Sequence, residues 1–227
     1  MEKFNETIKK EDKNLLNNLS FNKNKVPLIR ESTRILRPME YKLIYNSIPR
    51  KDYKTLLNAL LLTGMRYIEL QRFQSNPEWF DGDFIHLPVE AQRKVTKVRK
   101  KRKDGKERAS RRHKARVVIL NSLGKNVISY FIDINTPLPG YQSWKDDLRR
   151  WAKNAGLDPQ KINVKTTRKT WCSWLLATYG TNRLTEITLS MGHDSITSIK
   201  HYLSVGFTDD DKSQIKEYTE GWIKKEE

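Results

Sequence analysis

The chain has 227 residues, one cysteine and a formal net charge of +17, from 44 Lys and Arg against 27 Asp and Glu. The single cysteine, Cys172, excludes an internal disulfide framework and a cysteine-based metal cluster. No apolar run reaches about 18 residues and the N-terminus is polar, which predicts an intracellular protein without a membrane span. The positive charge predicts a polyanionic partner, with nucleic acid the first candidate and an anionic membrane surface the second.

Most of the chain carries helical patterns. Residues 1–35 are polar and rich in Asn and Lys, so we expect an arm or linker there, followed by one folded domain over 36–227. The helix predicted over 51–62 is apolar almost all round, which is typical of a central, buried helix. Other helices are predicted over 38–48, 66–73, 122–132, 142–155, 164–179, 184–191, 196–203 and 212–224.

The positive charge is concentrated in one segment. Residues 93–116 contain fourteen Lys or Arg and two acids, a net charge of +12, whereas the other 203 residues carry only +5. Strand patterns over 84–87 and 116–120 flank an Asp104-Gly105 turn signal, so we expect a long hairpin over 84–120. Its basic side chains either form a phosphate-binding arm or a solvated loop. The candidates for DNA contact are Lys97, Arg99, Lys100, Lys101, Arg102, Lys103, Lys106, Arg108, Arg111, Arg112 and Lys114.

With this hairpin, the predicted fold class is mostly α with one small antiparallel β-sheet (α+β). We see no internal repeat in the sequence.

The first candidate functional residue is Arg66, in the run Leu-Thr-Gly-Met-Arg-Tyr-Ile-Glu-Leu that begins at residue 62. Gly64 allows a sharp turn into a new helix, and Arg66 lies at its start. Glu69, three residues on, shares a helix face with Arg66 and could orient its guanidinium. The alternative is a surface ion pair that contributes little to stability.

The second group is Lys165 and Arg168, which project from one helix face. That face continues through the apolar residues Trp171 and Leu175, so Arg168 lies in line with the core. A buried guanidinium needs an anionic partner, and no acid lies within a turn of it. A phosphate would serve, although a side chain that reaches solvent from the core edge is the alternative.

The third group is Gly192-His193, at a predicted helix start, followed by Tyr202 nine residues after the histidine. A lone histidine is more often structural than catalytic, and most tyrosines of a globular domain belong to its core. Their spacing from the two arginines distinguishes this pair: Arg168 lies 102 positions after Arg66, and His193 lies 25 positions after Arg168.

These four residues, in this order and at these distances, resemble the tyrosine recombinase (phage-type integrase) family over about residues 36–203. Arg66 matches the box I arginine, Arg168 the box II arginine, His193 the Gly-His histidine and Tyr202 the nucleophile. Two positions depart from the family pattern: Lys165 stands where the family most often has His, and Lys169 where another His is common. A box II lysine resembles some archaeal and archaeal-virus integrases.

The resemblance implies a catalytic domain over 36–227 that cleaves and rejoins double-stranded DNA through a covalent 3′-phosphotyrosyl intermediate, without a metal, another cofactor or ATP. Two arginines can bind the non-bridging oxygens of a phosphodiester, where negative charge increases during nucleophilic attack. A tyrosine with a pKa near 10 needs cationic neighbours or a base to react. The usual N-terminal core-binding domain has no room here, so the arm replaces it or the chain is part of a longer protein.

The leaving 5′-oxygen needs a proton, which a lysine beside DNA can supply. In the family this lysine lies on the second strand of the small sheet. If Asp104-Gly105 centres the hairpin, Arg116 pairs with Arg93 or Lys94. We therefore choose Lys94 as the general acid and Lys97 as the second choice.

The C-terminal segment predicts a tail helix over 208–227, with acids in its first turn and Ile215, Tyr218 and Trp222 on one face. It either folds back on its own core or, as the resemblance implies, docks on a neighbouring protomer. The second alternative would leave an apolar patch to be covered by a partner and predicts a homo-oligomer on DNA, a tetramer when two sites are paired.

The predicted function is site-specific recombination and integration, including integration of a viral genome. The alternatives are a type IB topoisomerase with the same chemistry and a DNA-binding protein without catalysis. A membrane-surface protein fits poorly because the basic run lacks an apolar face.

Overall fold

The computed structural model describes residues 26–92, 114–134, 136–193 and 205–223. Its elements are β1 (Leu28–Arg30), β2 (Thr33–Ile35), α2 (Pro38–Asn46), α3 (Lys51–Thr63), α4 (Tyr67–Gln74), the 3₁₀ turn η2 (Pro77–Trp79), β3 (Phe84–Leu87), α5 (Val89–Gln92), β4 (Arg116–Ile119), α6 (Ser122–Ile132), α7 (Tyr141–Asn154), α8 (Thr166–Tyr179), α9 (Leu184–Met191) and α11 (Asp209–Thr219). None of the helices in these ranges combines the length and apolarity needed to cross a membrane.

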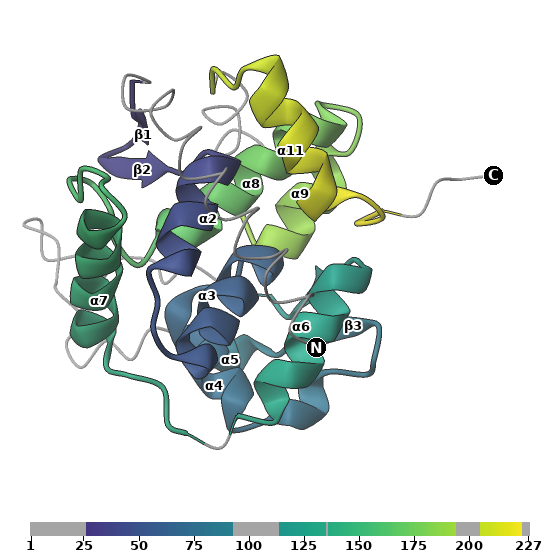
Figure 1. Cartoon of the computed structure of the whole chain (residues 1–227). Helices are drawn as coiled ribbons and strands as arrows, with labels where there is room; N and C mark the ends of the chain where they lie inside the picture. Colours follow the sequence, from purple (N-terminus) through teal and green to yellow (C-terminus); the bar gives the residue numbers. More distant parts are fainter. Residues whose placement is uncertain (1–25, 93–113, 135, 194–204, 224–227) are drawn as a thin grey trace, which may run out of the picture.

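Helix α3 lies at the centre of the helices, as its pattern predicts (Figure 1). Its second half, Leu56 to Thr63 apart from Asn58, is buried and packs against α6 and α8. Helix α8 is the second buried helix and inserts Trp171 and Trp174 into the same core. Because α3 ends and α8 begins beside each other in this core, their terminal residues are held in fixed positions.

Residues 28–35 are part of the folded domain, which corrects the expected arm over 1–35. Strands β1 and β2 pair antiparallel, and Thr33, Arg34 and Ile35 of β2 are all buried. The guanidinium of Arg34 explains this burial, because it donates to a carboxylate oxygen of Glu40 at 2.6 Å and to the Asp158 carbonyl at 2.7 Å. Residues 1–25 lie outside the described residues.

Strands β3 and β4 pair antiparallel, but their register differs from the expected one. Arg116 lies opposite Leu87, not opposite Arg93 or Lys94. Pro88, which has no N–H to donate, follows β3, and the chain then turns into the short helix α5. Gln92 fixes this turn by donating to the Lys114 carbonyl at 2.7 Å. The register argument that favoured Lys94 over Lys97 is therefore wrong.

The tail helix is shorter than expected and folds on its own chain. Helix α11 runs from Asp209 to Thr219, and Thr208 caps it by accepting from the Asp211 N–H. Asp211 forms a buried ion pair with Arg37, while Ile215 and Trp222 are fully buried within the chain. Of the two alternatives, the structure has the fold-back, so no apolar patch of Ile215 and Trp222 is left for a partner.

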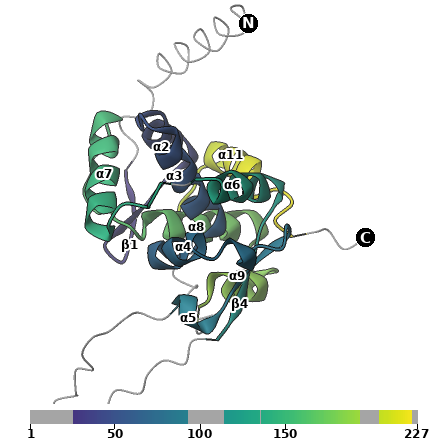
Figure 2. The ribbon, with the colours of Figure 1, turned by 90° about the horizontal axis from the view of Figure 1, so that it is seen from below.

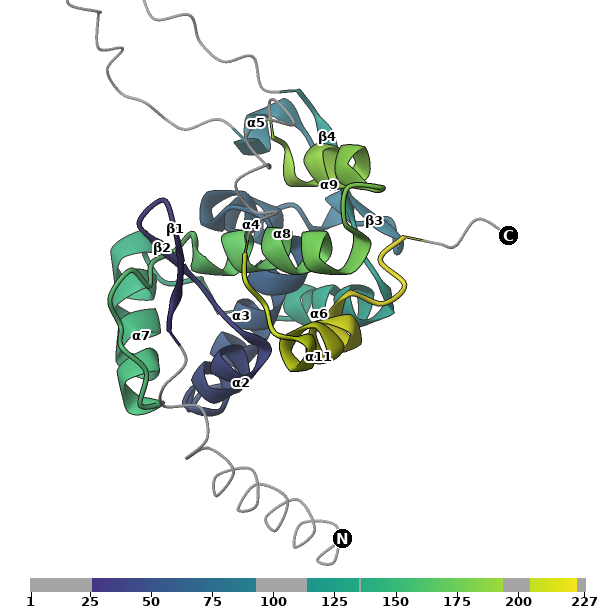
Figure 3. The ribbon, with the colours of Figure 1, turned by 90° about the horizontal axis from the view of Figure 1, so that it is seen from above.

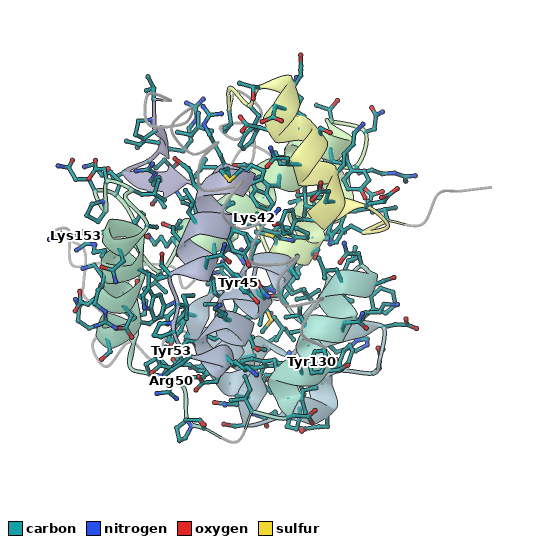
Figure 4. The ribbon with its side chains drawn as sticks, in the orientation of Figure 1. Lys42, Tyr45, Arg50, Tyr53, Tyr130 and Lys153 are labelled. Carbon is teal, nitrogen blue, oxygen red and sulfur yellow. The ribbon has the colours of Figure 1, made fainter. Side chains whose placement is uncertain are left out.

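The described elements lie on two sides of α4 and α8. Figures 2 and 3 show α5, α9 and β4 on one side and α2, α6 and α11 on the other. A cavity of about 300 Å³ opens on the second side, lined by residues such as Tyr41, Lys42, Tyr45 and Leu123. Figure 4 faces this side, with Lys42 and Tyr45 of α2 near its centre. Arg66, Arg168 and His193 do not line this cavity.

A substitution at Gly64 tests how tightly α3, α8 and α9 pack against one another at this point. We expect Gly64→Ala to lower the free energy of unfolding by roughly 2–4 kcal/mol, since a left-handed backbone (φ +59°) costs alanine about 1 kcal/mol and overpacking adds roughly 1–3 kcal/mol. A Cβ at residue 64 would lie 2.6 Å from the Met191 sulfur and 2.8 Å from Trp171 Cδ1. Urea unfolding of the purified variant measures the loss.

Gly156→Ala is the matched control, because Gly156 is also left-handed (φ +73°) but has nothing within 4 Å of its ideal Cβ position. Its free energy of unfolding should fall only by the cost of the left-handed backbone, about 1 kcal/mol. Equal losses in the two variants would contradict the close approach at Gly64.

Candidate functional site

Arg66 is held at the start of α4 by a carboxylate that is completely buried. The left-handed Gly64 ends α3, and Arg66 is the extended residue that precedes α4. The Arg66 N–H donates to Glu69 Oε2 at 2.7 Å and its Nη1 donates to Oε1 at 2.6 Å. Because Glu69 has no exposed surface, the alternative of a surface ion pair is wrong.

A second arginine shares this carboxylate. Arg116, the first residue of β4, donates from Nη2 to Glu69 Oε2 at 2.7 Å. Only 5% of its side chain is exposed, and its Nε and Nη1 have no hydrogen-bond partner among the described residues. Burial raises the pKa of Glu69, but the guanidiniums of Arg116, Arg168 and Arg66 outweigh it and lower this pKa from 4.5 to about 2.

Arg168 joins two chain turns beside this cluster. From the first turn of α8, its Nη1 donates to the Gly64 carbonyl at 2.6 Å and its Nη2 donates to the Met191 carbonyl. The expectation that only an anion could partner this arginine is thus corrected, since two backbone carbonyls do so. Burial, together with the charge of Arg66, lowers the pKa of Arg168 to about 9, so the guanidinium remains a cation at neutral pH.

His193 follows the end of α9. Gly192 caps α9 in the left-handed conformation, and the His193 N–H donates to the Thr188 carbonyl at 3.0 Å. The glycine therefore ends a helix, whereas the predicted helix start beyond it falls outside the described residues. Burial and the neighbouring guanidiniums of Arg168, Arg66 and Arg116 lower the pKa of His193 to about 3. The imidazole is neutral at pH 7 and can accept or donate one hydrogen bond.

The cluster carries an excess of positive charge. Three guanidiniums face one carboxylate and a neutral imidazole, so Arg66, Arg116 and Arg168 minus Glu69 leave two positive charges. Planar guanidiniums bind phosphate and carboxylate oxygens in pairs, which makes a phosphate a suitable ligand. Among the described residues, no group of three or more His, Cys, Asp or Glu side chains could hold a metal ion.

The other predicted residues lie at the edge of this site or outside the described residues. Lys165 is exposed and precedes α8, one turn before Arg168. Lys169 is buried and donates to the Arg30 carbonyl at 3.1 Å and to the Glu31 carboxylate at 2.9 Å, so it holds the β1–β2 turn. Lys114 is exposed before β4. Outside the described residues lie Tyr202, Lys94, Lys97 and the basic residues from Arg99 to Arg112.

Arg116 is the site residue that the sequence analysis missed. It was treated only as the marker of a strand. The signal was present, because Arg116 shares the inner face of β4 with Val118, and the alternation continues to the buried Leu120. A charged residue on the buried face of a strand indicates a buried partner of opposite charge.

No family model matches the sequence, and no curated protein matches it either. Solved structures do match the fold. The Tn1549 transposon integrase, in complex with circular intermediate DNA, is 15% identical with a TM-score of 0.55, over 83% of this chain and 68% of that one. The XerA recombinase is 14% identical with a TM-score of 0.51, over 82% and 65%, so this chain spans just under two thirds of its length.

This is the fold of a tyrosine recombinase catalytic domain. The predicted mostly helical class is confirmed, with two small antiparallel sheets in the described residues where one was expected.

The depressed pKa of His193 makes stability depend on pH. Between about pH 6.5 and 3 the unfolded chain binds a proton at His193 that the folded chain does not, so the free energy of unfolding should fall as pH falls. One such proton corresponds to a slope of about 1.4 kcal/mol per pH unit. His193→Gln should flatten the slope in this window, measured by urea unfolding at several pH values. His86→Gln, on the exposed side of β3, is the control, and a His193→Gln curve parallel to wild type would contradict this origin.

Proposed function

We propose that the chain is a site-specific DNA recombinase (integrase) that cleaves and rejoins DNA through a covalent phosphotyrosyl intermediate. One observation carries the proposal. Arg66 and Arg168, 102 positions apart in the sequence, lie with Arg116 around the buried Glu69 carboxylate, and His193 lies in the field of the same three guanidiniums. Three guanidiniums against one carboxylate leave an excess of two positive charges in this cluster of described residues. A scissile phosphodiester would supply the missing negative charge. The likeness in fold to the Tn1549 integrase and the XerA recombinase supports the same conclusion.

In the proposed reaction the hydroxyl oxygen of Tyr202 attacks the scissile phosphorus, and the bond from phosphorus to the 5′-oxygen breaks. The guanidiniums of Arg66 and Arg168 bind the non-bridging oxygens, where negative charge accumulates. The Tyr202 hydroxyl loses its proton to water or to the neutral imidazole of His193 as its oxygen attacks, and the imidazole can also donate a hydrogen bond to the phosphate. Reversal by a 5′-hydroxyl of another strand restores the phosphodiester and releases Tyr202, so the step consumes no ATP.

The leaving 5′-oxygen takes its proton from a lysine of the basic segment. Lys94 and Lys97 are both candidates, and the β3–β4 register no longer ranks them. Lys165, the exposed residue before α8, adds a further cation one turn from Arg168. The basic residues from Lys97 to Lys114 contact the DNA backbone and provide affinity that depends strongly on salt.

The finer parts of the proposal rest on the resemblance. An archaeal or archaeal-virus origin rests on Lys165 and the length of the basic segment. Exchange between two duplexes requires several active sites at once, so we expect a multimer on DNA, a tetramer when two sites are paired. Because α11 packs on its own chain, the multimer forms through other surfaces or by exchange of α11. The DNA substrate places the reaction inside a cell.

Tyr202→Phe tests the nucleophile. A DNA duplex with a nick just beyond the cleavage site loses its short 5′-hydroxyl fragment on cleavage, so the covalent adduct accumulates. Wild type should yield a protein band retarded by DNA in a denaturing gel, and Tyr202→Phe should yield none while its Kd for DNA changes little. An adduct in the variant would contradict the assignment.

The adduct assay, strand exchange between two duplexes and relaxation of a supercoiled plasmid together separate the alternatives for the wild-type chain. Adduct formation with exchange of strands between two duplexes supports a recombinase. An adduct with relaxation of supercoiled DNA alone supports a type IB topoisomerase, and DNA binding without an adduct supports a non-catalytic DNA-binding protein.

Arg66→Ala and Arg168→Ala should each slow cleavage on the order of 10²–10³-fold, as expected for a lost donor to the transition state. Both variants should also lower the melting temperature, because Arg168→Ala leaves the Gly64 and Met191 carbonyls without their donors and Arg66→Ala leaves Oε1 of the buried Glu69 without its donor. Single-turnover cleavage and thermal melts measure both effects. A wild-type cleavage rate in either variant would show that the substituted arginine does not bind the scissile phosphate.

A further inference from the structure

We propose that Arg116 is a positioning residue for strand cleavage, which acts by fixing the Glu69 carboxylate that orients Arg66. The proposal rests on the proposed function and extends it to a residue of the small sheet. Only 5% of the Arg116 side chain is exposed, which favours action through its neighbours over direct contact with DNA.

The Glu69 carboxylate is divided between two arginines. Oε1 accepts the Arg66 guanidinium at 2.6 Å, whereas Oε2 accepts the Arg116 guanidinium and the Arg66 N–H, both at 2.7 Å. Three donors fix the plane of the carboxylate. Without Arg116, Oε2 keeps a single donor from the backbone, and the carboxylate that aims the Arg66 side chain can rotate.

Arg116 also contacts the turn that carries His193. An ideal Cβ on Gly192 would lie 2.5 Å from Arg116 Nε and 2.7 Å from its Cδ, so the side chain packs directly against the Gly192 backbone. Gly192 precedes His193 and follows Met191, whose carbonyl accepts from Arg168. Arg116 therefore contacts one group that orients Arg66 and one turn that positions both His193 and Arg168.

Burial of the Arg116 guanidinium is costly for the fold. Two donors of Arg116, Nε and Nη1, are buried without a partner in the described part of the chain, and an unsatisfied buried donor costs on the order of 1–3 kcal/mol. A methionine of similar length would avoid this cost and would pack in the same space between β4 and α9. A buried cation at this place is thus better explained by what it does to Glu69 and the Gly192 turn than by stability of the fold.

The test compares two substrates. In a methylphosphonate, one non-bridging oxygen of the scissile phosphate is replaced by a methyl group. This replacement removes the negative charge that Arg66 and Arg168 neutralise. A variant that is defective only because Arg66 and Arg168 are misaligned should regain activity on this substrate relative to wild type. A variant whose fold is damaged should be equally slow on both substrates.

Arg116→Met should cleave an ordinary phosphodiester on the order of 10–100-fold more slowly than wild type, a smaller loss than removal of a direct donor. On the methylphosphonate the deficit should shrink to within about threefold, and the Kd for DNA should change little because no phosphate contact is lost. Arg34→Met is the matched control: Arg34 is 4% exposed and paired with Glu40, outside the cluster. It should change stability without a selective defect on the phosphodiester.

A double-variant cycle tests the route through Glu69. If Arg116 acts through this carboxylate, Glu69→Gln and Arg116→Met together should slow cleavage no more than the worse of the two alone. If Arg116→Met does not fold, Arg116→Lys, which keeps the charge but has one donor group, takes its place in the substrate comparison and the cycle.

Equal deficits on both substrates, or fully multiplicative losses in the cycle, would overturn the proposal. A wild-type chain that forms no adduct would instead refute the proposed function, so the two failures are distinguishable.

Discussion

A single ionised carboxylate, with no exposed surface, stabilises the three neighbouring arginines of the candidate site. Burial of a lone carboxylate is costly, and the charge is stable here only because cations surround it. Glu69 binds Arg66 and Arg116 directly and lies in the field of Arg168, which explains why its pKa falls to about 2 despite its burial. The reverse dependence holds as well, since three guanidiniums could not gather at one place without an anion among them. The position of each arginine therefore depends on the others.

Two glycines make this gathering possible. Gly64 lets α3 end against Met191 and Trp171, so that Arg66 begins the next helix within reach of its partners. Gly192 leaves room for the Arg116 side chain beneath the turn that ends α9. Both residues adopt left-handed backbone angles that other residues rarely adopt. The short runs Thr-Gly-Met-Arg and Met-Gly-His thus combine a steric requirement with a chemical one, which is why they are informative in a single sequence.

The helices and the residues at the centre of the site could be predicted from local pattern. The all-round apolar character of α3, the order of Arg66, Arg168 and His193 and the Glu69 partner all follow from spacing along the chain. The pairing of Leu87 with Arg116 could not be predicted, because the Asp104-Gly105 turn signal gave no information on how β3 ends at Pro88. The β1–β2 hairpin was also missed. Its strands have three residues each, and the contacts that bury Arg34 come from Glu40 and Asp158, the latter 124 residues away.

The measurement that tests the central claim most directly is identification of the residue that becomes linked to DNA. The adduct formed on nicked DNA is digested with nuclease and trypsin, and mass spectrometry locates the residual nucleotide. If the cationic site around Glu69 is a strand-cleavage centre, the nucleotide is attached through its 3′-phosphate to the peptide that contains Tyr202. Attachment to any other residue, or through a 5′-phosphate, would contradict the account.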